Sequence, residues 1–286
     1  MENLISIISI MGNKNKTDLQ IMNQDPAKEY AICCTPVSSM RAEPSHKSEI
    51  VSQQLFGEPC KIIERVSDKG DHWVKVKSRY EGYEGWCQQG HITGIEESQY
   101  KSEDKRLMDG WINKVEYNGK KMIVPMGSSL SVIPGGQANW NKNIVRFNGQ
   151  IWNKAIFHSK EEIVRELGSR FLNTSYLWGG KSVFGVDCSG FAQTIYKFLD
   201  IPLPRDAYQQ AAEGEVVGFL QEARCGDLAF FDNAEGRITH VGLLLNEHEI
   251  LHSSVNVRVD KIDTQGIINQ DTFERTHKLR IIKRYF

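Results

Sequence analysis

One stretch limits what this chain can fold into more than any other: Gly185-Val186-Asp187-Cys188-Ser189-Gly190-Phe191, with the residues that follow it. The apolar side chains after Gly190 fall at the spacing of one helix face: Phe191, Ala192, Ile195, Tyr196 and Leu199. Asp187 is suited to cap that helix, so Cys188 would occupy its first turn. The unpaired N–H groups there favour a thiolate, which is a strong nucleophile. Cys188 is therefore a candidate nucleophile.

A cysteine beside an apolar helix is usually a small buried hydrophobic residue, so position alone does not make Cys188 reactive. Its surroundings favour a reactive role. Glycine-rich stretches, Tyr176-Leu177-Trp178-Gly179-Gly180 and the segment that contains Cys188, are typical of close backbone approach to a ligand. Two histidines further along the chain can serve as bases.

These histidines, His240 and His252, lie in two strand-like runs joined by a short polar turn. Residues paired directly across a hairpin share a face, so the loop length decides whether the two rings meet. A two-residue loop would place the histidines on opposite faces. A three-residue loop, residues 246–248, would pair His252 with Gly242 and place both rings on one face. If both act at one site, we predict the odd-length loop or a bulge.

Cys188, His240 and His252 together fit a cysteine–histidine system with a third, orienting group. His252 would accept a hydrogen bond from His240, the other His240 nitrogen would face Cys188, and Gly242 would leave open space beside them. A lone strand histidine is more often structural, and the three residues are also a possible zinc site with an open fourth position. The place of Cys188 at a helix start favours catalysis without metal or cofactor. The remaining histidines, His277 among them, are expected to be solvated.

Charge and hydropathy exclude several classes of function. The chain has 35 Lys and Arg against 36 Asp and Glu, so no broad basic surface for nucleic acid or an anionic membrane is expected. No apolar run approaches the roughly 18 residues that span a bilayer. The six cysteines have neither a disulfide-scaffold nor a C-x-x-C spacing. The apolar run Leu4–Ile10 lacks the basic start and cleavage site of a signal peptide, so a cytoplasmic location is expected, with secretion or the periplasm as the alternative.

Changes in the pattern of apolar, polar and turn residues divide the chain into four predicted segments. Residues 1–28 are polar and without period, as in a tail. Residues 29–100 and 101–156 have short apolar runs between turn residues, typical of two small all-β barrels. Ser129–Ile133 is one of the strands expected there. Residues 157–286 begin with helices and end with strands, which describes an α+β domain.

Residues 157–286 resemble the NlpC family of cysteine peptidases, which cut cell-wall peptides. The matching features cover nearly all of that segment: Tyr176–Gly180, Asp187–Phe191, Gly226-Asp227-Leu228, Thr239–Gly242 and His252. The resemblance implies a papain-like core and places the family's nucleophile on Cys188, its base on His240 and its orienting residue on His252. An acyl-enzyme on Cys188 would follow, its oxyanion held by the Cys188 N–H and a donor that the sequence does not identify.

The amino-terminal half resembles the two bacterial SH3-like barrels of one branch, the YkfC-like γ-D-glutamyl-diamino acid endopeptidases. Residues 48–58 and 81–86 carry this likeness. That branch hydrolyses the bond between γ-D-Glu and lysine or meso-diaminopimelate in peptides that begin with a free L-Ala. The resemblance therefore implies a monomeric, cytoplasmic enzyme that recycles short cell-wall peptides and releases L-Ala-γ-D-Glu. It leaves the choice between lysine and diaminopimelate open.

The same likeness implies the substrate contacts. Pro204–Gln210 matches the branch's segment that receives the L-Ala ammonium, which places the carboxylate on Asp206. Tyr83 of the first barrel is implied to close the far end of that pocket. Further residues are implied to line the channel: Ser189, Asp187 and Trp178. Ala207 departs from the serine expected at its position, so one side-chain hydrogen bond to the substrate is lost.

Two other functions stay open at this point. One is an inert protein that binds cell-wall peptide, and the other is an NlpC-type amidase or acyltransferase with a different acyl substrate. The intact set of Cys188, His240 and His252 argues against the first.

Overall fold

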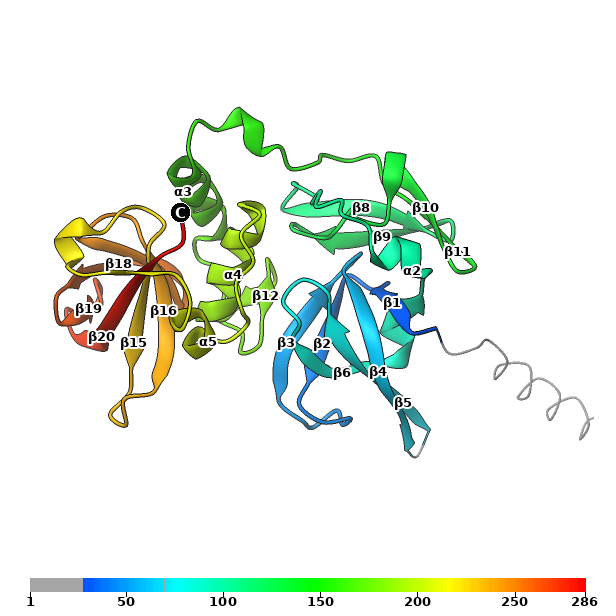
Figure 1. Cartoon of the computed structure of the whole chain (residues 1–286), viewed down its shortest axis with the longest axis horizontal. Coiled ribbons are helices and arrows are strands. Elements are labelled where there is room, and N and C mark those ends of the chain that lie inside the picture. The colour runs from blue at the N-terminus through cyan, green and yellow to red at the C-terminus, as the bar shows by residue number, and fades with distance from the viewer. Residues whose placement is uncertain (1–27, 69) are drawn as a thin grey trace, which may run out of the picture.

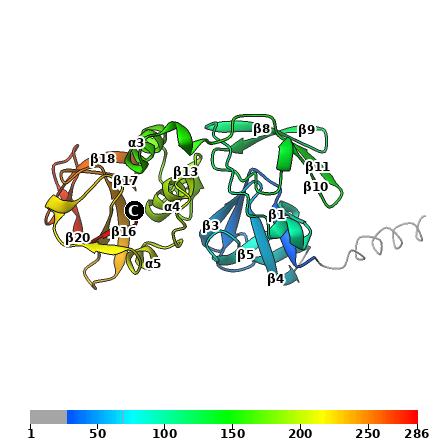
Figure 2. The ribbon, with the colours of Figure 1, turned by 45° about the horizontal axis from the view of Figure 1, so that its top comes forward.

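The chain folds into three units, described by a computed structural model over residues 28–68 and 70–286 (Figure 1). The predicted tail, apart from Lys28, and the apolar run Leu4–Ile10 lie outside the described residues. Two β units occupy one end of the molecule, and the third unit, which holds the longer helices, occupies the other (Figures 1 and 2). None of the described helices combines the length and the apolar character that crossing a bilayer would require.

The first unit is an antiparallel sheet of seven strands in the order β3-β2-β6-β5-β4-β1-β7. Its strands are β1 (Tyr30–Cys33), β2 (Val37–Arg41), β3 (Ile50–Leu55), β4 (Pro59–Asp68), β5 (Asp71–Ser78), β6 (Glu84–Gln88) and β7 (Ile92–Gly94). A 3-10 turn, η1 (Gln89–His91), precedes β7, and the short helix α2 (Glu97–Tyr100) follows it. The sheet encloses a small core of buried side chains: Ala31, Met40, Cys60, Val74, Val76 and Cys87.

The second unit is smaller and shares its core with the first. Its sheet has the order β10-β11-β8-β9, with β8 (Ile112–Tyr117), β9 (Lys120–Pro125), η2 (Pro134–Gly136), β10 (Gln137–Trp140), β11 (Asn143–Arg146) and η3 (Lys154–Ile156). Trp140 packs against Phe56 of the first unit with ring centroids 5.0 Å apart. The predicted strand Ser129–Ile133 is wrong, because this run makes only an isolated bridge from Ser129 to Leu107. Its apolar side chains are instead buried in the shared core.

The third unit begins with helices and ends with a sheet that closes on itself. Its elements are α3 (Lys160–Phe171), β12 (Lys181–Ser182), β13 (Gly185–Val186), α4 (Cys188–Phe198), α5 (Ala207–Ala211), β14 (Glu215–Val217), η4 (Leu220–Glu222), β15 (Leu228–Asp232), β16 (Ile238–Leu244), β17 (Glu249–Ser254), β18 (Asn256–Asp263), β19 (Gly266–Ile268) and β20 (Arg275–Arg284). The strands follow the order β14-β20-β15-β16-β17-β18-β19, and β19 also pairs with β20. Six of the seven strands therefore form a closed ring.

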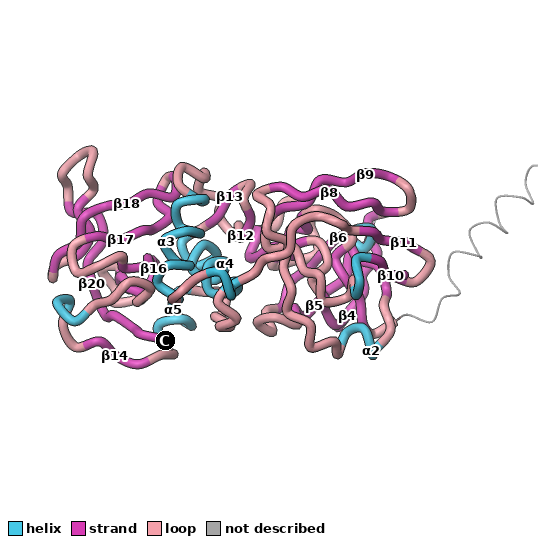
Figure 3. The backbone as a smooth tube through the Cα atoms, turned by 90° about the horizontal axis from the view of Figure 1, so that it is seen from above, coloured by secondary structure: helices cyan, strands magenta, loops and turns pink. Residues whose placement is uncertain are grey.

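The two faces of this closed sheet have different partners. The outer face packs against α3 and α4, and its buried side chains include Phe230, Val241, Leu243 and Leu251. The inner face has its own apolar cluster, which includes Ala229, Phe231, Leu244, Ile250, Ile262 and Ile267. Seen from above, α3 and α4 lie between the closed sheet and the two β units (Figure 3). The start of α4 is thus placed next to both the sheet and the first unit.

Buried charges join the first unit to the third. The Glu58 carboxylate is 3 % exposed, lies 2.5 Å from Lys197 Nζ and 3.3 Å from Lys181 Nζ, and Lys181 Nζ lies 3.5 Å from Glu81 Oε1. Burial alone would raise the pKa of Glu58, but the two ammonium groups outweigh it and hold this pKa at about 2. This interdomain charge cluster (Glu58, Glu81, Lys181 and Lys197) fixes β12 and α4 against the first unit.

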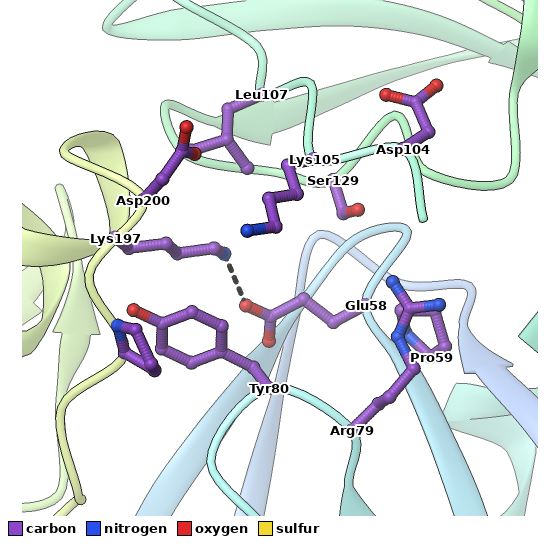
Figure 4. Close-up of a pocket in the computed structure, with 11 residues that line it drawn as sticks. Glu58, Pro59, Arg79, Tyr80, Asp104, Lys105, Leu107, Ser129, Lys197 and Asp200 are labelled. Atoms are coloured by element: carbon purple, nitrogen blue, oxygen red, sulfur yellow. Dashed lines mark hydrogen bonds and ion pairs between the residues drawn. The ribbon is translucent and has the colours of Figure 1, made fainter. Parts of the chain in front are cut away.

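A cavity of about 270 Å³ lies beside this cluster, where the three units meet (Figure 4). Glu58 and Tyr80 line it from the first unit, Leu107 and Ser129 from the second, and Lys197 from α4. None of the predicted site residues lines it. The cavity therefore lies at the interface of the three units and is not the predicted active site.

Replacing Glu58 by Gln should lower the free energy of unfolding by roughly 3–5 kcal/mol, because the buried Lys197 ammonium loses its carboxylate and Lys181 keeps only Glu81. Chemical denaturation at neutral pH measures this change. Glu84→Gln is the matched control, since Glu84 pairs with Lys75 at 3.4 Å but the two side chains are 39 % and 33 % exposed, and about 0–1 kcal/mol is expected there. Equally small losses in both variants would contradict a stabilising cluster.

Candidate active site

The helix that begins at Cys188 is capped as the sequence predicts. Asp187 is the N-cap residue of α4, and its Oδ1 accepts a hydrogen bond from the Gly190 N–H at 2.7 Å. A side chain does not fit at position 190, because its Cβ would lie 2.1 Å from the Gly180 carbonyl oxygen. Glycine at this position therefore lets the loop of residues 176–180 lie directly against the start of the helix.

The Asp187 carboxylate is fully occupied by the protein. Arg205 donates to both of its oxygens, at 3.0 and 2.6 Å. The Gly179 N–H, the Gly190 N–H and the Ser189 hydroxyl supply three more hydrogen bonds. Since a carboxylate has about four lone-pair positions, these contacts occupy Asp187 with the protein, and its predicted place in the lining of the channel stays a prediction. Ser189 also accepts from Arg205 at 2.9 Å, and its contact with substrate stays a prediction.

The two histidines meet in the way that the odd-length loop requires. β16 and β17 pair Gly242 with His252 and Leu244 with Ile250, which leaves residues 246–248 as the loop. His240 and His252 share a face, and His240 Nε2 lies 2.9 Å from His252 Nδ1. The predicted register and the predicted hydrogen bond between the imidazoles are confirmed.

The space beside Gly242 is filled rather than open. A Cβ at this position would lie 2.8 Å from the His252 Cβ and 2.7 Å from the Ile250 Cδ1. The expectation of open space next to the histidines is therefore wrong. Glycine is needed here because the His252 side chain packs directly against the β16 backbone.

Sequence reasoning missed a further member of this arrangement, Asp260 of β18. His252 Nε2 lies 3.0 Å from Asp260 Oδ2, and Asp260 Oδ1 accepts hydrogen bonds from Arg258 Nη2 and the Gln270 N–H, both at 2.9 Å. Burial alone would raise the pKa of Asp260, but these hydrogen bonds hold it at about 2. The alternation of apolar and polar residues over 257–260 was the available signal for a strand with a polar face.

A third imidazole covers His240. His277 of β20 stacks on the His240 ring with centroids 4.1 Å apart and an interplanar angle of 27°. Burial and the neighbouring His252 lower the pKa of His277 to about 4, so its ring is neutral at pH 7. His277 was expected to be solvated, and this expectation is wrong because β20 closes the sheet against β19 and carries the ring toward its inner face.

Cys188 is a neutral thiol in this environment. Its side chain is 7 % exposed, and burial together with the Asp187 carboxylate raises the pKa of the thiol to about 12. Burial, with the nearby His252 and His277, holds the pKa of His240 well below its usual range. Burial and the capping carboxylate thus oppose the thiolate that the helix N-terminus favours. Proton transfer from Cys188 has to accompany attack on a substrate.

The sulfur and the base are carried on packed elements but are not bonded to each other. α4 packs against β16, and the Cys188 sulfur lies near the backbone N–H of Val241, the residue after His240. Within residues 28–68 and 70–286 no hydrogen bond links Cys188 Sγ to an imidazole, so this predicted contact is not made here. Catalytic hydrogen bonds are often long before substrate binds. The His240 nitrogen that does not face His252 is Nδ1.

The predicted zinc alternative depends on three convergent donors. Among the described residues, no three His, Cys, Asp or Glu side chains are grouped so that they could hold one metal ion. His240 and His252 instead direct one ring nitrogen each at the other.

The predicted ammonium pocket brings two units together. The Tyr83 hydroxyl of the first unit donates to Asp206 of the third, at 3.3 Å from Oδ2 and 3.4 Å from Oδ1. Burial raises the pKa of Asp206, although Arg205 and Tyr83 act in the opposite direction. Trp178 is 61 % exposed and donates its indole N–H to Glu49 Oε1 at 2.6 Å. Tyr83 and Asp206 thus meet, and their substrate roles and that of Trp178 stay predictions.

Comparisons with known proteins agree with this architecture. Residues 173–276 match a family model described as the NlpC/P60 family, and residues 40–92 match one described as the bacterial dipeptidyl-peptidase Sh3 domain. A gamma-D-glutamyl-L-lysine dipeptidyl-peptidase of Bacillus subtilis is 46 % identical over 237 residues, which cover 71 % of this chain and 72 % of that one. The protein of the same name from Bacillus cereus is 28 % identical over 255 residues, which cover 79 % and 74 %.

A solved NlpC/P60 family protein from Bacillus cereus has a similar overall fold. The two structures superpose with a TM-score of 0.68 at 20 % identity, over 90 % of this chain and 99 % of that one. At this identity the likeness shows the fold alone. The predicted fold class, an α+β peptidase domain preceded by all-β SH3-like units, is confirmed.

Replacing His277 by Ala should slow the alkylation of Cys188 by iodoacetamide about fivefold, because the His240 ring loses a stacking contact worth on the order of 1 kcal/mol. His277→Phe keeps a ring at this position and should react at nearly the wild-type rate. Mass spectrometry of the peptide that contains Cys188 measures both rates. An Ala variant that reacts as fast as the wild type would show that the stack does not position His240.

Proposed function

The chain belongs to the NlpC/P60 family, and on this basis we propose that it is a cysteine peptidase that hydrolyses the bond between γ-D-Glu and a diamino acid in short cell-wall peptides. The observation that carries the proposal is the 2.9 Å contact between His240 and His252 on strands packed against α4, whose first residue is Cys188. A nucleophile, a base and a group that orients the base thus lie on neighbouring elements.

In the proposed reaction the Cys188 sulfur attacks the γ-glutamyl carbonyl carbon while His240 Nδ1 takes the thiol proton. His240 returns this proton to the leaving amine as the C–N bond breaks, which leaves a thioester on Cys188. A water that gives a proton to His240 then hydrolyses the thioester and restores the thiol. The Cys188 N–H has no acceptor within α4 and is suited to hold the oxyanion. Charge separation arises only as the bonds change, because both groups are neutral at rest.

Asp206 and Tyr83 support a substrate with a free amino terminus. The half-buried Asp206 carboxylate accepts a hydrogen bond from the Tyr83 hydroxyl at 3.3 Å, and it would form a charge-assisted hydrogen bond with an arriving ammonium group. Because Tyr83 belongs to the first unit, that unit closes this end of the pocket. Both Bacillus relatives are named gamma-D-glutamyl-L-lysine dipeptidyl-peptidase, which supports cleavage after γ-D-Glu with release of a dipeptide.

The closed end of the pocket favours trimming of short peptides over cutting of the intact wall. A chain extended beyond the L-Ala nitrogen would meet Tyr83 and leave Asp206 without a cation. We therefore propose a role in the recycling of cell-wall peptides in the cytoplasm, by the monomer.

Incubation with L-Ala-γ-D-Glu-meso-diaminopimelate, and separately with the lysine peptide, should release L-Ala-γ-D-Glu, measured by liquid chromatography and mass spectrometry. The N-acetylated peptides should be cleaved about 10- to 100-fold more slowly, because a charge-assisted hydrogen bond to Asp206 is lost. The ratio of the rates for the two free-amine peptides gives the preference between the diamino acids.

Cys188→Ala is the inactive control in this experiment. No dipeptide from either free-amine peptide would reject the proposed function. Equal cleavage of free and acetylated peptides would reject the ammonium pocket and keep the peptidase. Activity lost to a strong chelator but retained after alkylation of Cys188 would favour the zinc alternative.

The KM for the free-amine peptide should rise with falling pH, beginning above the pH range in which an ordinary aspartate titrates. Burial raises the pKa of Asp206, so this carboxylate takes up its proton at a higher pH, and the neutral acid does not pair with an ammonium group. Asp206→Asn should raise KM about 10- to 100-fold at pH 7 and abolish this pH dependence.

Asp200→Asn is the matched control, since Asp200 is a partly exposed aspartate that pairs with Lys154. It should keep both the KM and its pH profile. A wild-type KM that does not change down to the pH of ordinary aspartate titration would contradict the role of Asp206.

A further inference from the structure

Three hydrogen-bonded side chains follow one another along the inner face of the closed sheet: Asp260, His252 and His240. We call this chain of contacts the polar file. Asp260 is 1 % exposed and forms an ion pair with Arg258, whose Nη2 donates to Asp260 Oδ1 at 2.9 Å. The second donor to Oδ1 is the Gln270 N–H. Only Oδ2 is left to face His252, whose Nε2 lies 3.0 Å away. Because an ionised carboxylate only accepts hydrogen bonds, His252 Nε2 must carry a proton.

The position of this proton determines which nitrogen of each histidine ring is protonated. Asp260 also pairs with Arg258, so what its carboxylate requires from His252 is a hydrogen-bond donor, which a neutral ring protonated at Nε2 supplies. A neutral His252 protonated at Nε2 has its lone pair on Nδ1. That nitrogen faces His240 Nε2 at 2.9 Å, so the hydrogen of this contact belongs to His240. His240 then has its lone pair on Nδ1, the nitrogen directed away from His252.

We propose that Asp260 is a positioning residue that sets the tautomers of both histidines, and so keeps His240 Nδ1 free to take the Cys188 proton. This inference rests on the proposed function only in assigning the base role to His240. Asp260 itself does not contact the substrate or the sulfur. Asp260 acts on His240 through two hydrogen bonds, from His252 to Asp260 and from His240 to His252, and the carboxylate sets the direction of both.

Asp260→Asn is a sharp test because it reverses every proton in the file while keeping its shape. The two donors on Oδ1, Arg258 and the Gln270 N–H, hold the amide oxygen in place. The amide NH₂ must then face His252 Nε2 and donate to it. His252 carries its proton on Nδ1, donates to His240 Nε2, and leaves the His240 proton on Nδ1, where it blocks the base.

The groups around this file are few. Phe231 and His277 flank the His240 ring, with centroids 5.7 and 4.1 Å away. Asp271 lies 2.8 Å from Arg258 Nη1, and its side chain is 74 % exposed. The file therefore has one buried anion, Asp260, that can direct the tautomer of His252.

The first measurement needs no variant. Nitrogen-15 NMR of histidine-labelled wild-type protein at neutral pH should show His240 and His252 both protonated at Nε2 and unprotonated at Nδ1, with assignments from His240→Gln and His252→Gln. In Asp260→Asn both rings should switch to the Nδ1-protonated form. Wild-type rings protonated at Nδ1 would overturn the proposal, whatever the enzyme does to peptides.

The second measurement uses hydrolysis of L-Ala-γ-D-Glu-diamino acid peptide. Asp260→Asn should lower kcat on the order of 10²- to 10⁴-fold, with KM nearly unchanged, because substrate contacts are kept and the base has the wrong tautomer. Asp263→Asn is the matched control on the same strand, since Asp263 pairs with Arg275 at 2.6 Å and contacts no histidine. It should keep both kcat and the tautomers.

The outcomes separate this inference from the proposed function. Wild-type protein that fails to cleave the peptide but shows the expected tautomers rejects the substrate and keeps the role of Asp260. A folded Asp260→Asn variant with kcat within threefold of the wild type would falsify the positioning role. Asp260→Glu restores a carboxylate and should recover the Nε2-protonated rings together with part of kcat.

Discussion

The buried ion pair between Arg205 and Asp187 is the contact on which the rest of the site depends. Arg205 is 2 % exposed, binds both oxygens of Asp187, and donates to the Ser52 hydroxyl of β3 at 3.2 Å. It therefore joins the cap of the Cys188 helix to the first β unit, and its sequence neighbour Asp206 is held at the boundary of the same units. Removing either partner leaves the other as an uncompensated buried charge, which lowers the free energy of unfolding by roughly 3–5 kcal/mol. The same change would disturb both the helix start that carries Cys188 and the pocket around Asp206.

Features that depend on a few consecutive residues could be predicted from the sequence, and features that depend on distant packing could not. The Asp187 cap and the three-residue hairpin loop follow from local spacing. Asp260 follows a turn in which Val255 adopts a φ of 67°, a conformation that is rare for a β-branched residue. The position that needs this φ holds a valine instead of a glycine, so β18 could not be predicted from the sequence at this turn. The neutral Cys188 thiol results from burial against β16, which no local pattern reveals.

The inner face of the closed sheet holds the two histidines in apolar surroundings. The polar file shares this face with apolar side chains such as Phe231 and Ile250. In such surroundings hydrogen bonds polarise one another, and a donor that faces a donor is costly. A neutral thiol and neutral imidazoles also avoid the desolvation of a permanent ion pair. The base is therefore oriented before any peptide arrives, at a small electrostatic cost to the fold.

The division of the interdomain charge cluster between units has a consequence for biosynthesis. Glu58 and Glu81 leave the ribosome well before Lys181 and Lys197, so the two carboxylates are synthesised before their partners exist. Docking of α4 and β12 must then strip water from four charges at once. The wall of the pocket around Tyr83 is therefore synthesised before Cys188, His240 and His252, and it meets Asp206 only after docking.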